Sequence, residues 1–147
     1  MGVTARKFFS IEEKKAIKGA VEEAERNTSG EIRVHIENNC KGEVLDRAAY
    51  LFKQLGMEKT ELRNGVLFYL AIKNRQFAIL GDRGINAGVP EKFWDEIAQM
   101  MTEKFKEGKF TEGLEQGILK AGKKLKEHFP YQKDDVNELS DEISFGE

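Results

Sequence analysis

The chain has 147 residues and a mass of 16.8 kDa, which is the size of a single domain. Its 24 basic and 26 acidic residues give a net charge of −2, but residues 130–147 carry six acids and one base (−5), which leaves +3 on residues 1–129. A hydrophobic fraction of 39% excludes a wholly disordered chain, and one cysteine, Cys40, excludes an internal disulfide and a multi-cysteine zinc site.

Two features of the sequence bear on its compartment. Residues 1–10 lack the apolar segment of a secretory signal. The longest apolar run, Val66 to Ile72, is far shorter than the ~20 residues that cross a bilayer. We therefore expect a cytoplasmic protein with no membrane span.

Hydrophobic periodicity predicts the elements of the first half of the chain. Ser10 and Glu13 have the spacing of a capping box, so a helix is expected over residues 11–27. Apolar residues alternate with polar ones over residues 32–37, which predicts a strand with one buried face. A second amphipathic helix is expected over residues 44–55.

The second half begins with an apolar run that follows Asn64 and Gly65. Residues 66–72 are expected to form a strand buried on both faces, and a tight turn leads to a return strand over residues 77–80. Pro90 suits the first position of a helix, which is predicted to run to Phe105. A last helix over residues 110–125 precedes Pro130, and residues 130–147 are expected to form an acidic, mobile tail outside a domain of residues 1–129.

This α-β-α-β-β-α-α order indicates an α/β fold, a three-layer α/β/α sandwich with a short mixed central sheet. A strand–helix–strand unit makes a parallel crossover, so the first two strands should be parallel and the third antiparallel to the second. Residues 28–31, 63–65 and 82–86 should then meet at one end of the sheet.

The residues at this end of the sheet are rich in oxygen donors. Glu31, Asn64, Asp82 and Asn86 carry the carboxylate and amide oxygens that Ca²⁺ and Mg²⁺ prefer. The residues alone leave two interpretations open, a cation site or turns with solvated acids.

Other candidates have simpler explanations. We interpret His35 as a surface histidine of an edge strand, although a ligand or general base is the alternative. We interpret Lys120, Lys123, Lys124 and Lys126 as a solvated helix face, so no nucleic acid is expected as a partner. Gly113 and Gly117 favour close helix packing, with a dimer contact as the less favoured interpretation; we therefore expect a monomer.

Several ordered motifs resemble the TPM domain family over about residues 8–128. They are Phe9-Ser10 with the acidic helix that follows, Thr28-Ser29-Gly30-Glu31-Ile32-Arg33-Val34, Asn64-Gly65-Val66-Leu67, Gly81-Asp82-Arg83-Gly84-Ile85, and Phe110 with Glu112-Gly113-Leu114. The chain is similar to the small stand-alone bacterial form of this family. Many members have Gly-Tyr-Gly-Leu-Glu where this chain has residues 81–86, so a family glutamate is replaced here and Asp82 is gained.

The resemblance implies an α/β/α sandwich, divalent-cation binding and an acid phosphatase activity. Our leading hypothesis is a Ca²⁺ or Mg²⁺ site with Glu31 and Asp82 as ligands and Asn64 in support. For a phosphatase, Asp82 is the candidate carboxylate, and Arg83 or Arg63 would hold the phosphoryl oxygens. The alternative is a non-enzymatic interaction module with a protein partner, which assists the maintenance of membrane proteins or complexes.

Overall fold

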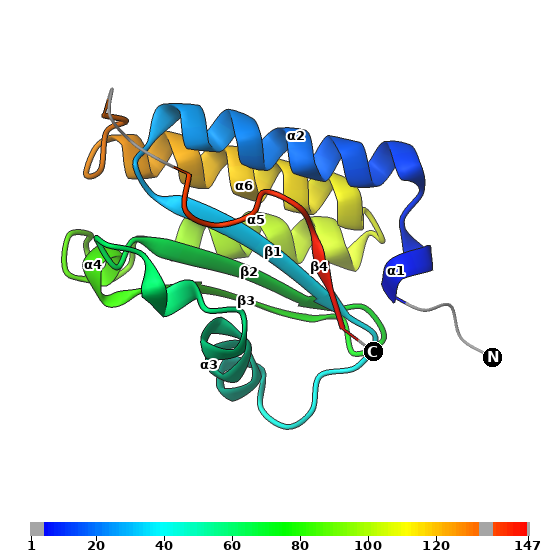
Figure 1. Ribbon diagram of the computed structural model, residues 1–147. Coiled ribbons are helices and arrows are strands. Elements are labelled where there is room, and N and C mark those ends of the chain that lie inside the picture. Colours follow the sequence, from blue (N-terminus) through cyan, green and yellow to red (C-terminus); the bar gives the residue numbers. More distant parts are fainter. Residues whose placement is uncertain (1–4, 133–136, 147) are drawn as a thin grey trace.

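The computed structural model describes residues 5–132 and 137–146. Its helices and strands follow each other along the chain as shown in Figure 1. They are α1 (Ala5–Phe8), α2 (Ile11–Asn27), β1 (Glu31–Glu37), α3 (Val44–Gln54), the 3₁₀ turn η1 (Met57–Lys59), β2 (Gly65–Ala71), β3 (Gln76–Gly81), α4 (Arg83–Asn86), α5 (Asp95–Lys106), α6 (Phe110–Lys126) and β4 (Ser144–Phe145).

The sheet has the strand order β3-β2-β1-β4. β1 and β2 are parallel, with Glu31 opposite Gly65, and β3 is antiparallel to β2, with Gly81 opposite Val66. The predicted strand directions are therefore confirmed. β4, which pairs with β1 in parallel at His35 and Ile36, was not predicted.

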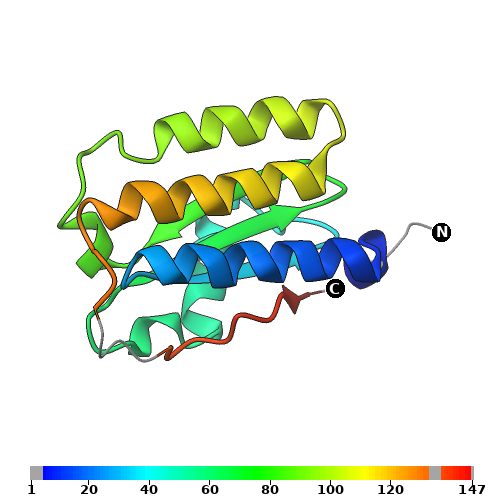
Figure 2. The same cartoon turned by 90° about the horizontal axis from the view of Figure 1, so that it is seen from above.

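The sheet lies between two helical layers, which confirms the three-layer sandwich. Helices α2, α6 and α5 lie side by side over one face (Figure 2), and α3 covers the other (Figure 1). All seven residues of β2 are buried, because alternate side chains enter cores on opposite faces. Val66 and Phe68 join the core under α2, α5 and α6, whereas Leu67 and Tyr69 join the core over α3.

The first long helix, α2, begins with the predicted capping box. The Ser10 hydroxyl accepts a hydrogen bond from the Glu13 amide at 3.0 Å, and the Glu13 carboxylate accepts one from the Ser10 amide at 2.9 Å. Two of the free amides at the start of α2 are satisfied in this way, and the helix covers the predicted range, residues 11–27.

Glycines allow α6 to pack closely against its neighbours. A Cβ atom on Gly117 would lie 2.4 Å from Sδ of Met101, and one on Gly122 would lie 2.7 Å from Cβ of Ala24. The face of these glycines is therefore occupied by α5 and α2 of the same chain, as the favoured interpretation predicted.

The segment between β3 and α5 differs from its prediction. α4 forms where a loop was expected, because the Asp82 carboxylate accepts a hydrogen bond from the Arg83 amide at 2.7 Å and caps it. α5 begins at Asp95 rather than at Pro90. The chain before it makes tight i to i+3 bonds, from the Phe93 amide to the Pro90 carbonyl among others, instead of a continuous α-helix.

The described part of the C-terminal segment, residues 137–146, runs along the β1 edge of the sheet and lies beside α2 when seen from above (Figures 1 and 2). Leu139 is 9% exposed in the core over α3, and the Gly146 amide donates to the Ile36 carbonyl at 2.9 Å. The predicted tail thus supplies an edge strand, while its acids Asp134, Asp135 and Glu147 lie outside the described residues. The domain boundary at residue 129 and the mobility of the tail stay predictions.

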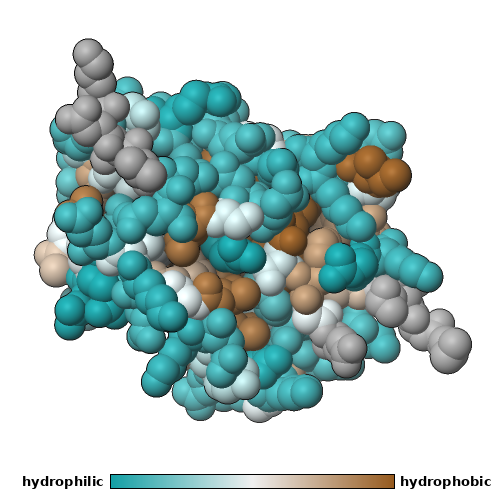
Figure 3. Space-filling model, in the orientation of Figure 1, coloured by the Kyte–Doolittle hydropathy of each residue, from teal (hydrophilic) through white to brown (hydrophobic). Residues whose placement is uncertain are grey.

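The face that carries this segment is mostly hydrophilic, with small separate hydrophobic areas (Figure 3). Within the described residues no helix is both long and apolar enough to cross a membrane.

Candidate functional site

The three predicted loops meet at one end of the sheet. The starts of β1 and β2 and the end of β3 are neighbours in the strand register, and the Glu31 amide donates to the Asn64 carbonyl at 2.9 Å. The topology therefore brings Glu31, Asn64 and Asp82 to the same edge. Their side chains, however, have different partners.

Asp82 forms a bidentate ion pair with Arg63. Its Oδ2 lies 2.8 Å from Nε of Arg63 and its Oδ1 lies 2.9 Å from Nη2, while Oδ1 also caps α4. Asp82 is 6% exposed, whereas the next residue, Arg83, is exposed to solvent. Asp82 thus anchors Arg63 and the start of α4, and a cation would compete with the guanidinium for both oxygens.

Asn64 is tied to the first of the three loops. Its Nδ2 donates to the Ser29 carbonyl at 2.6 Å, and its backbone amide donates to Oγ1 of Thr60 at 3.1 Å. The side-chain oxygen Oδ1 is buried and has no hydrogen-bond partner in the described part of the chain. Asn64 therefore has one free ligand atom.

Glu31 binds the C-terminal segment. Its Oε1 accepts hydrogen bonds from the backbone amides of Glu138 and Leu139, the second at 2.8 Å. Its Oε2 is buried, without a partner among the described residues, and the residue is 4% exposed. Burial raises the pKa of Glu31 to about 7, against the lowering effect of the two amides.

The three predicted ligands thus bind different partners in this structure, and the site they were expected to form stays a prediction. Over residues 5–132 and 137–146, no three Asp, Glu, His or Cys side chains lie close enough together to hold a metal ion. A cation site that Asp82 shares with Glu31 would require the ion pair with Arg63 to open, because both Asp82 oxygens are bound by Arg63 and one of them also by the α4 amide.

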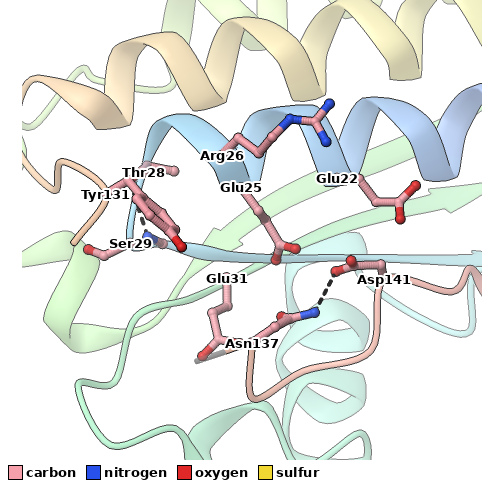
Figure 4. A pocket seen from close by; sticks show the side chains of 10 residues that line it. Glu22, Glu25, Arg26, Thr28, Ser29, Glu31, Tyr131, Asn137 and Asp141 are labelled. Carbon is pink, nitrogen blue, oxygen red and sulfur yellow. Dashed lines mark hydrogen bonds between the residues drawn. The ribbon is translucent and has the colours of Figure 1, made fainter. Parts of the chain in front are cut away.

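A second group of carboxylates lies on the other side of Glu31. A pocket of about 220 Å³ opens between the C-terminal half of α2, the start of β1 and the C-terminal segment (Figure 4). In Figure 4 the carboxyl groups of Glu25 and Asp141 point toward one another. The pocket is lined by Glu22, Glu25, Arg26, Thr28, Ser29, Gly30, Glu31, Tyr131, Asn137 and Asp141.

The electrostatics of this pocket are unusual at Glu25. Burial raises its pKa to about 9, and a hydrogen bond to Asp141 and the negative charges of Asp141 and Glu31 act in the same direction. A hydrogen bond of 3.0 Å from the Ile32 amide to its Oε2 opposes them. Glu25 is thus protonated at neutral pH. Oδ1 of Asp141 accepts a hydrogen bond from Nδ2 of Asn137 at 3.1 Å.

The sequence analysis missed Glu25 and Asp141. Glu22 and Glu25 are three residues apart on one helix face, a spacing that normally marks a solvated acidic stripe. Glu25 is half-buried because the C-terminal segment lies beside it. The sequence analysis expected that segment to be a mobile tail outside the domain.

His35 also differs from its prediction, because β4 covers it. The residue is 4% exposed, and its Nδ1 lies 2.9 Å from Oγ of Ser144. Its neighbour Glu37 accepts hydrogen bonds from Nε of Arg47 at 3.0 Å and from the Tyr69 hydroxyl at 2.7 Å. Burial lowers the pKa of His35, so the ring is neutral and ties β4 to the sheet.

Comparison with known proteins identifies the family. The family model for the TPM domain matches residues 3–124. The chain belongs to the TPM domain family. No curated protein matches it.

Three solved structures resemble this TPM domain. The NMR structure of the BA42 protein from the psychrophilic bacterium Bizionia argentinensis is 48% identical with a TM-score of 0.90, over 95% of this chain and 96% of that one. The N-terminal domain of a protein from P. gingivalis is 22% identical with a TM-score of 0.68, over 84% and 82% of the two chains. The N-terminal domain of a Corynebacterium glutamicum protein is 13% identical with a TM-score of 0.61, over 95% and 81%. The last two share the fold alone.

Proposed function

We propose that this TPM domain binds a hydrated divalent cation, Ca²⁺ or Mg²⁺, between Glu25 and Asp141. The observation that carries the proposal is that the carboxyl groups of Glu25 and Asp141 point toward one another in one pocket (Figure 4), where the raised pKa of Glu25 keeps a proton on it and reduces their repulsion. A divalent cation would replace that proton and neutralise both groups.

The residues present fit a cation that keeps part of its water shell. Mg²⁺ is commonly bound through one or two carboxylates with several waters, and Ca²⁺ accepts carboxylate, amide and water oxygens. Glu25 and Asp141 would supply the carboxylates, and Asn137 an amide oxygen. Glu31 lines the same pocket, but it does not form a three-carboxylate ligand set with Glu25 and Asp141 in the described residues, so it adds negative charge beside the site rather than a ligand.

The experiment is a titration with CaCl₂ and with MgCl₂, followed by ¹H–¹⁵N NMR. We expect saturable shifts at residues 22–31 and 137–141, with a dissociation constant of about 0.1–1 mM, the range of sites with few charged ligands. Glu25→Gln and Asp141→Asn should each weaken binding at least about tenfold, whereas Glu12→Gln, at an exposed acid of the same helix, should not.

Two results would contradict this site. Shifts confined to residues 63–65 and 82–86 would support the ligand set predicted from the sequence, with Asp82 released from Arg63. Unchanged spectra at several millimolar of either cation would remove the proposal altogether.

Phosphatase activity, the enzymatic extension of the family resemblance, has less support. Arg63 and Asp82 bind each other through two hydrogen bonds, so neither is available for a phosphoryl group while the pair is closed. Release of phosphate from p-nitrophenyl phosphate, with and without Mg²⁺, tests this directly. Activity that depends on Asp82 and on the metal would restore the predicted catalytic role.

A further inference from the structure

The outer edge of β3 is unusually open to pairing. β3 is the last strand of the sheet on its side and pairs with β2 alone, in unbroken register from Gln76 to Gly81. Edge strands are normally protected by charges, proline or bulges, but Gln76–Gly81 reads QFAILG and has none of these. Among the described residues, the one side-chain hydrogen bond to its backbone comes from Asn86, at the Gly81 carbonyl.

A small cavity adjoins the beginning of this strand. It has a volume of about 200 Å³ and lies between β3 and the C-terminal end of α5, which is the outermost helix of its layer in Figure 2. Its apolar wall contains the rings of Phe77 and Phe105, whose centroids are 5.1 Å apart in an edge-to-face arrangement. The other lining residues are Arg75, Thr102 and Lys106.

The two cations of this cavity have no acidic partner in the described part of the chain. Arg75 ends the turn before β3 and Lys106 is the last residue of α5, and both side chains are exposed. Elsewhere on the surface, cations such as Lys18 and Lys120 lie 2.6 Å from a glutamate oxygen. The cavity beside β3 is thus apolar inside and positive at its rim.

Strand direction determines what such a groove can bind. A strand that adds to β3 in the antiparallel sense runs from Gly81 toward Gln76, so its carboxyl end comes to lie beside Arg75 and Lys106. Because side chains alternate along a strand, the last residue can direct an apolar side chain into the cavity while its carboxylate meets the two cations.

We propose that β3 and α5 form a docking groove for the carboxyl-terminal strand of a partner protein. The main chain of the partner extends the sheet, an apolar terminal side chain packs against the rings of Phe77 and Phe105 in the cavity, and the free carboxylate is held by Arg75 and Lys106. This is recognition by strand addition combined with capture of a chain terminus. It gives the predicted interaction module a specific surface and a specific kind of partner.

The test compares two synthetic peptides, Thr-Val-Thr-Val-Thr-Val with a free carboxyl group and the same peptide with a carboxamide end. We expect the free acid to shift the ¹H–¹⁵N resonances of residues 75–81 and 102–106, and to bind about tenfold more tightly than the amide. In the double variant Arg75→Asn/Lys106→Gln the two peptides should bind equally weakly. Asparagine is chosen at position 75 because Arg75 has φ of 53°.

Two further variants separate charge from shape. Thr102→Leu should fill the cavity and weaken both peptides by a similar factor, of about tenfold. Lys123→Gln/Lys126→Gln removes the same amount of charge from an exposed face of α6 and should change nothing. The proposal is overturned if neither peptide shifts β3 at about 1 mM, if acid and amide bind wild type equally, or if the shifts map to the β1–β4 edge.

Discussion

Replacement of Glu25 by glutamine should stabilise the protein at neutral pH. In the folded chain the pKa of Glu25 is about 9, against 4.5 for an ordinary glutamate, because of burial and the neighbouring Asp141. At pH 7 the unfolded carboxylate is ionised and must take up a proton on folding. Glutamine has the same shape, keeps an oxygen for the Ile32 amide, and offers an N–H group to Asp141 without that cost.

The magnitude follows from linkage between protonation and folding. For each pH unit between the ordinary pKa of glutamate and pH 7, protonation of Glu25 on folding costs about 1.4 kcal/mol. The gain in the free energy of unfolding from Glu25→Gln therefore has an upper limit of about 3 kcal/mol. Because part of the side chain is in contact with water, we expect a gain of about 1–2 kcal/mol in the free energy of unfolding.

The pH dependence has a definite sign. A carboxyl whose folded pKa is raised stabilises the fold most below its unfolded pKa, and this stabilisation is lost as the pH rises toward the folded pKa. The advantage of Glu25→Gln should thus be absent near pH 4.5, grow through neutrality and level off near pH 9. Glu31 titrates in both proteins, so the difference between them isolates Glu25.

Urea denaturation in EDTA, followed by fluorescence of Trp94, measures this difference at several pH values, with Glu12→Gln as the matched control. A glutamine variant that is less stable than wild type at pH 7 would refute the reasoning. So would a constant difference across the pH range. Addition of Ca²⁺ or Mg²⁺ in place of EDTA should stabilise wild type and leave Glu25→Gln almost unchanged.

Four substitutions test the packing and the helix cap. Leu139→Ala should lower the free energy of unfolding by about 2–3 kcal/mol if the C-terminal segment packs over α3 as described; a loss below about 0.5 kcal/mol would show that it does not. Gly122→Ala should destabilise the protein by about 1–3 kcal/mol, because the new Cβ would lie 2.8 Å from Cα of Ala24. Gly19→Ala should stabilise it by about 1 kcal/mol, because no atom lies within 4 Å of the new Cβ. Equal effects of the two substitutions in thermal or urea unfolding would contradict the close packing. Ser10→Ala removes one bond of the capping box and should cost about 1 kcal/mol by the same measurement, and no change would mean that water replaces it.

Periodicity and turn chemistry predicted the architecture well because those signals are local. The capping box at Ser10, the doubly buried run after Gly65 and the handedness of the crossover each act over a few residues or follow from chain chirality. β4 has two paired residues and follows a polar stretch, so it has no pattern of its own. Its position depends on tertiary contacts, such as those of Leu139 and Ser144, that no sequence window contains.

The candidate site was predicted only in part for the same reason. The predicted topology correctly placed Glu31 and Asp82 at one end of the sheet. The order and direction of strands do not determine, however, which partner a side chain contacts. Arg63, with its backbone at φ 51°, folds back onto Asp82 and removes it from the set. In the proposed site Asp141 takes its place, from a segment more than a hundred residues away along the chain from Glu25, and spacing arguments do not reach that far.

The two proposals occupy opposite edges of the sheet and can be tested independently. The cation pocket lies where β1 meets the C-terminal segment, whereas the peptide groove lies along β3, with β2 between them (Figure 1). Substitutions without shared partners have additive effects. Arg75→Asn/Lys106→Gln should therefore leave cation affinity unchanged, and Glu25→Gln should leave peptide affinity unchanged, within about twofold. A larger change in either cross-experiment would mean that the sheet transmits binding from one edge to the other, and the domain would then have to be treated as one coupled unit.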